Sequence, residues 1–134
     1  MEIKKNSDFV ILIIDDETTI TNTLAAILIK DEFNVISASD SLTGLNKALE
    51  EKPDLILLDI SMPNMSGMEM LKKLRESGEY GKNVKVILLT SLTADDSIMR
   101  GIVQEHPSFY LTKSTSTTKD IIQKIKEALG IQQV

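Results

Sequence analysis

Asp59 is the residue whose position most strongly indicates chemistry. It directly follows the apolar run Leu55–Leu58, which suits a strand that is buried on both faces. Pro63, Asn64 and Gly67 then turn the chain away from the end of this strand. Because the carboxyl ends of strands line the ligand crevice in open α/β sheets, a lone carboxylate here is well placed to act as a nucleophile.

The other candidate residues are an acidic pair, a hydroxyl and a cation, namely Asp15, Asp16, Thr90 and Lys113. Carboxylates that share a site with Asp59 repel one another unless a cation lies among them. Oxygen ligands favour a hard ion, and few carboxylates with room for water suit Mg²⁺ better than Ca²⁺. A metal, a lysine and a hydroxyl match phosphoryl transfer, which depends on positioning and charge neutralisation. Asp59 would then form an acyl phosphate.

Strands and helices in strict alternation are predicted to position these residues. The expected strands are Phe9–Ile14, Asn34–Ala38, Leu55–Leu58, Val84–Leu89 and Ser108–Thr112. Apolar residues at helical spacing predict a helix after each strand. The first two helices are expected over Thr18–Lys30 and Ser41–Glu51, and the last three begin near the capping residues Ser66, Thr93 and Thr117. A polar loop is expected from Ser77 to Asn83.

This alternation predicts an α/β fold with a doubly wound, five-stranded parallel sheet and helices on both faces. Right-handed crossovers favour the strand order 2-1-3-4-5, in which the first and third strands are neighbours. Asp15, Asp16 and Asp59 should therefore converge on one crevice. Thr90 and Lys113 should lie on the same rim of the sheet.

Length and composition narrow the possible domain organisation, partners and localisation of the protein. The 134 residues predict a single domain over 1–134 with a core of about 9–129. The formal net charge of −5 argues against nucleic-acid binding, which requires clustered Lys and Arg. The chain has no signal-peptide pattern and no apolar run long enough to span a membrane, so a cytoplasmic protein is expected.

Four stretches of the chain read ILIIDDE, DLILLDISMPNMSG, VILLTS and FYLTK. Together they resemble the receiver domain of two-component response regulators, in its chemotaxis-regulator-like form. The resemblance implies a flavodoxin-like fold and makes Asp59 the phosphoacceptor. It implies that Asp15, Asp16, Asp59 and the backbone carbonyl of Ser61 hold Mg²⁺, with Mn²⁺ as the alternative ion.

The resemblance also assigns roles on the other side of the crevice. Thr90 would bind a phosphoryl oxygen, Lys113 would pair with the phosphate, and Tyr110 would be the switch aromatic. The implied donor is a sensor histidine kinase or a histidine phosphotransfer protein, and the implied output is contact with an unknown downstream protein. Self-catalysed phosphorylation and autodephosphorylation are the only reactions implied, so no enzyme activity is expected.

One departure from the family concerns the residue after Lys113. The family usually has proline there, commonly joined by a cis peptide bond, and this chain has Ser114. A non-proline cis bond costs about 3 kcal/mol, so the local backbone is expected to differ. We nevertheless expect Lys113 to reach the crevice.

Two other functions are compatible with the sequence. A degenerate receiver that acts only as a binding module is one alternative, and an aspartyl-phosphate phosphatase is another. The phosphatase is disfavoured because Ser61 stands where the haloacid-dehalogenase class has a second Asp. Only five residues follow Leu129, so no output domain is expected within this chain. Met65 and Met68 are expected near the core, and Met62 and Met70 over the site loop.

Overall fold

A five-stranded, all-parallel sheet with the order β2-β1-β3-β4-β5 forms the centre of the protein. The computed structural model describes residues 5–60, 62, 65–90, 109–113 and 116–131. The strands are β1 Val10–Ile14, β2 Asn34–Ala38, β3 Leu55–Asp59, β4 Lys85–Thr90 and β5 Phe109–Thr112. The predicted fold class and strand order are confirmed.

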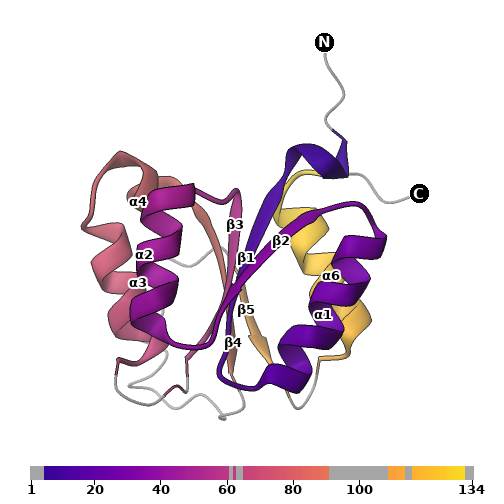
Figure 1. Ribbon diagram of the computed structural model, residues 1–134, viewed down its shortest axis with the longest axis horizontal. Coiled ribbons are helices and arrows are strands. Elements are labelled where there is room, and N and C mark those ends of the chain that lie inside the picture. Colours follow the sequence, from indigo (N-terminus) through magenta and orange to yellow (C-terminus); the bar gives the residue numbers. More distant parts are fainter. Residues whose placement is uncertain (1–4, 61, 63–64, 91–108, 114–115, 132–134) are drawn as a thin grey trace.

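Helices cover both faces of this sheet (Figure 1). The helices are a short 3-10 turn at Asn6–Asp8, α1 Thr18–Lys30, α2 Ser41–Glu51, α3 Gly67–Arg75, α4 Glu79–Asn83 and α6 Thr118–Ala128. In Figure 1, α2, α3 and α4 lie on one face and α1 and α6 on the other. The helix predicted to begin near Thr93 lies outside the described residues. No helix in the described part of the chain has the length and apolar content needed to cross a membrane.

The two central strands are almost completely buried, and only Val10 at the start of β1 is partly exposed. Successive side chains of a strand point to opposite faces, so β1 and β3 contribute to two separate apolar clusters. Leu12 and Leu58 belong to the cluster under α2 and α3, whereas Ile13 and Leu57 belong to the cluster under α1 and α6. All four side chains are at most 1% exposed. The continuous apolar runs in the sequence are explained by this burial on both faces.

Side-chain caps begin several helices where the sequence predicts them. Asp40 accepts a hydrogen bond of 2.8 Å from the backbone N–H of Thr43, and this bond lowers the pKa of Asp40. Thr117 and Asp120 form a reciprocal capping box at the start of α6. These caps satisfy backbone groups that a helix end leaves unpaired.

The predicted polar loop at residues 79–83 is instead the helix α4. The guanidinium of Arg75 donates to the carbonyl oxygens of Gly81 at 2.9 Å and Val84 at 2.7 Å. Gly81 also lies so close to the carbonyl of Leu74 that a Cβ atom would not fit. Contacts with α3 therefore stabilise a helical turn whose own sequence is polar and short.

Two predictions about apolar side chains were wrong. Met62 is 7% exposed and Met70 is 0% exposed, so they belong to the core and do not cover the site loop. Met65 and Met68 are partly buried and pack against this core, as expected. A helix buries the side of its surface that meets the sheet, and the docking angle of α3 places Met70 on that side. Sequence spacing leaves this angle undetermined.

Candidate functional site

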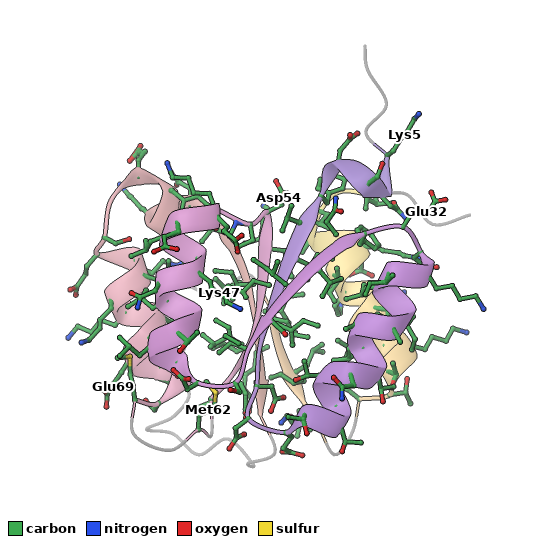
Figure 2. The ribbon with its side chains drawn as sticks, viewed as in Figure 1. Lys5, Glu32, Lys47, Asp54, Met62 and Glu69 are labelled. Atoms are coloured by element: carbon green, nitrogen blue, oxygen red, sulfur yellow. The ribbon has the colours of Figure 1, made fainter. Side chains whose placement is uncertain are left out.

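Asp15 and Asp59 lie side by side at the carboxyl end of the sheet. β1 and β3 are parallel neighbours, and Ile14 is in register with Leu58. The next residue of each strand is therefore an aspartate at the same level. Both aspartates are buried, with exposed fractions of 3% and 2%. Met62 lies at this end of the sheet, and Asp54 at the opposite end (Figure 2).

Four carboxylates form a compact cluster at the carboxyl ends of β1 and β3. Asp15, Asp16, Glu17 and Asp59 each offer one oxygen atom, and these atoms all lie within 4.8 Å of one another. Asp16 and Glu17 are exposed, whereas the other two are buried. An all-oxygen set with two buried anions fits a hard divalent cation such as Mg²⁺. The predicted convergence of Asp15, Asp16 and Asp59 is observed.

Lys113 reaches into the cluster from the end of β5, as expected. Its Nζ atom lies 3.0 Å from Oδ2 of Asp15, 3.1 Å from Oε1 of Glu17 and 3.5 Å from Oδ2 of Asp59. Burial lowers the pKa of Lys113, but hydrogen bonds to Asp15 and Glu17 outweigh it, so the pKa lies above its usual value. Lys113 is therefore a cation at neutral pH.

Backbone hydrogen bonds hold the acidic turn after β1 in place. The N–H of Asp15 donates to the carbonyl of Ala38 at 3.2 Å. The N–H of Glu17 donates to Oδ1 of Asp15 at 2.9 Å. One oxygen of Asp15 is thus bound by its own turn and the other by Lys113, which gives this buried carboxylate a single orientation.

The start of α3 presses against the backbone of Asp59. The N–H of Gly67 donates to the carbonyl of Ile60 at 3.0 Å, and the N–H of Ile60 donates to the carbonyl of Leu89 at 3.1 Å. A Cβ atom at Gly67 would overlap the carbonyl oxygen of Asp59 and lie 2.8 Å from Cα of Ile60. Glycine is therefore needed at this position for close approach of the two backbones.

The remaining predicted site residues are described only in part. Thr90 ends β4 and is in register with Thr112, so its backbone lies on the expected rim of the sheet. Tyr110 packs against the core cluster under α2 and α3, and its hydroxyl is buried without a hydrogen-bond partner among the described residues. Ser61 and Ser114 lie outside those residues, as does the peptide bond between Lys113 and Ser114.

Glu17 is a site residue that the sequence reasoning missed. It stands directly after the acidic pair and occupies the N-cap position of α1, where an acidic residue has an ordinary structural explanation. Its hydrogen bond to Lys113 joins residues 96 positions apart in the chain. Adjacency to Asp15 and Asp16 was the only available signal.

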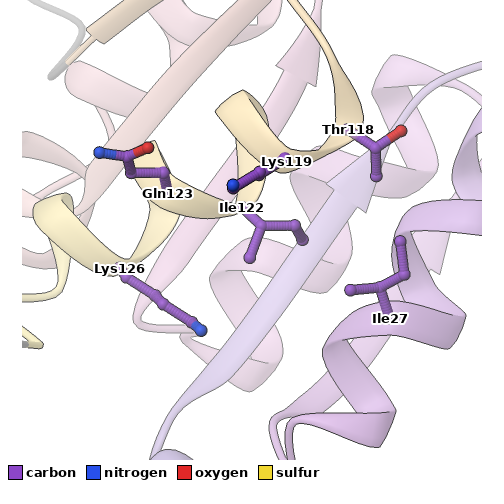
Figure 3. A pocket seen from close by; sticks show the side chains of 6 residues that line it. All are labelled: Ile27, Thr118, Lys119, Ile122, Gln123 and Lys126. Carbon is purple, nitrogen blue, oxygen red and sulfur yellow. The ribbon is translucent and has the colours of Figure 1, made fainter. Parts of the chain in front are cut away.

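A groove lies between α1 and α6 (Figure 3), and none of the residues of the acidic cluster line it. This groove has a volume of about 320 Å³ and is lined by Ile27, Thr118, Lys119, Ile122, Gln123 and Lys126. Lys126 forms an ion pair of 3.3 Å with Asp31. The residues that line the groove include no carboxylate, so it lacks the chemistry of the acidic cluster.

Comparisons with known proteins agree with this geometry. The family described as "Response regulator receiver domain" matches residues 11–126. The chain is 35% identical over 88 residues to sporulation initiation phosphotransferase F of Bacillus subtilis, which covers 66% of this chain and 68% of that protein. It is also 35% identical over 124 residues to hybrid signal transduction histidine kinase D of Dictyostelium discoideum, which covers 92% of this chain but only 8% of that kinase.

A solved structure shows the same architecture. The chain is similar to a CheY-like response regulator receiver domain protein from Methanospirillum hungatei JF-1, with a TM-score of 0.82 and 30% sequence identity. The alignment covers 91% of this chain and 94% of that one. The three-layer fold is therefore shared with a solved receiver domain.

Proposed function

This chain belongs to the response regulator receiver domain family, and from that premise we propose that it accepts a phosphoryl group on Asp59 in a Mg²⁺-dependent reaction. The observation that carries the proposal is the environment of this carboxylate. Asp59 is 2% exposed, shares a carboxylate cluster with Asp15 and has the Lys113 ammonium 3.5 Å away. A buried anion beside a cation and a metal-binding set matches the needs of phosphoryl transfer.

Different residues would bind the metal, attack the phosphorus atom and bind the transferred group. Asp15, Asp16, Asp59 and the carbonyl of Ser61 would hold Mg²⁺, which supplies charge neutralisation for the phosphoryl oxygens. An oxygen of Asp59 attacks phosphorus and forms the new P–O bond. The P–N bond of a phosphohistidine on the donor breaks, and the imidazole nitrogen leaves with the bonding electron pair. Lys113 and Thr90 would bind oxygens of the transferred group.

The donor and the output belong to the same proposal. A sensor histidine kinase or a histidine phosphotransfer protein would supply the phosphoryl group. Phosphorylation replaces the single negative charge of the Asp59 carboxylate by a phosphoryl group that carries close to two negative charges and several strong acceptor oxygens, and Tyr110 would respond by changing its packing against the core. A downstream protein would then recognise the altered surface, which is the general form of such switches.

Intact-mass measurement after incubation with acetyl phosphate tests the proposal directly. We expect one phosphoryl adduct that requires Mg²⁺, is absent in Asp59→Asn and is retained in the matched control Asp40→Asn, because Asn can also cap α2. A folded protein without an adduct would contradict the proposal and favour a phosphorylation-independent binding module. Sustained turnover of small phosphoesters would instead favour an aspartyl-phosphate phosphatase.

A further inference from the structure

The ion pair between Glu17 and Lys113 has no place in the phosphoryl chemistry described above. Lys113 would serve the phosphoryl group on Asp59, yet its ammonium lies closer to Oε1 of Glu17, at 3.1 Å, than to Oδ2 of Asp59, at 3.5 Å. The third and shortest contact, at 3.0 Å, is to Asp15. In the unphosphorylated protein the Lys113 ammonium thus contacts three carboxylates. One of them, Glu17, is outside the expected metal-binding set.

The pair joins opposite sides of the crevice. Glu17 follows β1, Lys113 follows β5, and β3 and β4 lie between these two strands in the sheet. The lysine side chain therefore extends across the ends of two strands to reach its partner. The backbone N–H of Glu17 is bound to Asp15 at 2.9 Å, so the glutamate is anchored at the base of its side chain.

The three carboxylates differ in how easily they can give up the ammonium. The side chains of Asp15 and Asp59 are 3% and 1% exposed, whereas that of Glu17 is 54% exposed. Water can hydrate the Glu17 carboxylate as soon as the contact breaks, so giving up this contact costs less than giving up a contact with a buried carboxylate. Glu17 is thus the partner that Lys113 can leave most easily.

We propose that Glu17 is a positioning residue for Lys113. It holds the ammonium at the mouth of the crevice while Asp59 is unphosphorylated and releases it when a phosphoryl group arrives. The inference rests on the proposed function, because the release requires a new anion at Asp59. The phosphoryl group carries more charge and more acceptor atoms than the carboxylate it modifies, so the ammonium moves toward Asp59.

Proton–nitrogen correlation spectra of lysine ammonium groups test this inference, because they detect ammonium groups that are held in hydrogen bonds. The Lys113 peak is assigned by its absence in Lys113→Arg. We expect the peak in the wild-type protein and a shifted peak in Glu17→Gln, because Asp15 and Asp59 still hold the ammonium there. When Mg²⁺ and beryllofluoride, an acyl-phosphate mimic, are added, the peak should have the same position in the wild type and in Glu17→Gln. The matched control is Glu127→Gln, which removes the exposed partner of Lys124 at 3.0 Å and should leave the Lys113 peak unchanged.

Three results would overturn the inference. They are a Lys113 peak absent from the wild-type protein, a peak unaffected by Glu17→Gln, and peaks of the wild type and Glu17→Gln that still differ after the mimic is bound. A wild-type protein whose spectrum ignores the mimic and which forms no phosphoryl adduct would contradict the proposed function instead. In that case the free-protein spectra of wild type and Glu17→Gln still decide whether Glu17 positions Lys113.

Discussion

Lys113 supplies the positive charge that two buried carboxylates require. Asp15 and Asp59 are almost completely shielded from water, and their mutual repulsion is relieved by an ammonium 3.0 Å from one and 3.5 Å from the other. The proposed Mg²⁺ would act on the same two groups. The lysine and the metal are therefore partly interchangeable as sources of charge neutralisation.

Replacement of Lys113 by Met should make the stability of the protein depend more strongly on metal. We expect the free energy of unfolding to fall by about 1–3 kcal/mol without Mg²⁺, because buried acceptors lose their partner. Added Mg²⁺ should recover more of this free energy in the variant than it adds to the wild type. Urea unfolding with and without Mg²⁺ measures both effects.

The matched control for this measurement is Lys124→Met. Lys124 pairs with Glu127 at 3.0 Å, and both side chains are more than a third exposed. An exposed pair contributes less than about 1 kcal/mol, and the stability of this variant should show no additional response to Mg²⁺. Equal losses and equal responses in the two variants would count against the electrostatic role of Lys113.

At the scale of the elements, the close packing of α3 against the end of β3 shapes the site. Gly67 is the first residue of α3 and lies against the carbonyl of Asp59 and the Cα of Ile60. This contact, together with the Gly67–Ile60 hydrogen bond of 3.0 Å, sets where the chain leaves the strand. The orientation of Asp59 therefore depends on a residue eight positions later in the sequence.

Substitution of Gly67 by Ala should disturb both stability and phosphoryl uptake. The new methyl group meets backbone atoms that cannot turn aside, and we expect a loss of about 1–3 kcal/mol, typical of overpacking. The rate of adduct formation with acetyl phosphate should also fall, because the backbone of Asp59 must shift. Mass spectrometry over time and urea unfolding provide the two readouts.

Gly44→Ala is the comparison for this prediction. The atoms nearest to its Cβ would be side-chain atoms of Ile14, the closest at 2.6 Å, and a side chain can adjust where a backbone cannot. The variant should lose less stability than Gly67→Ala and keep its rate of adduct formation. If both variants accept the phosphoryl group at the wild-type rate, the packing of α3 does not set the geometry of Asp59.

On the scale of the whole molecule, a cation at the crevice would link two central strands of the sheet. The carboxylates of Asp15 and Asp59 come from β1 and β3, which together join both apolar clusters. A metal that binds only the folded protein raises the stability of the entire domain. Metal binding at the two aspartates should therefore be detectable as an increase in the stability of the whole domain.

Titration with Mg²⁺ should raise the unfolding temperature of the wild-type protein. At a metal concentration about 100 times the Kd, the expected gain in the free energy of unfolding is about 2.7 kcal/mol. Asp15→Asn should abolish the Mg²⁺-dependent part of the shift, and Asp40→Asn should preserve it. Shifts of the same size in Asp15→Asn and the wild type would place the metal elsewhere.

The sequence by itself determined the sheet and the convergence of its aspartates. Strands buried on both faces must be continuously apolar, and the runs before Asp15 and Asp59 have this character. Alternation with helices and the handedness of crossovers then left few strand orders. In the favoured order β1 and β3 are neighbours, and Asp15 and Asp59 at their ends must therefore lie close together.

Only the tertiary structure decided which long-range contacts complete the site. Glu17 bonds to Lys113 because two strand ends 96 residues apart meet at one rim. Residues 79–83 are helical because Arg75 binds the carbonyls of Gly81 and Val84. Both features depend on the distance and angle between packed elements. Local propensity and residue spacing describe a single segment of the chain. They do not specify which other segment packs against it or which side chains meet there.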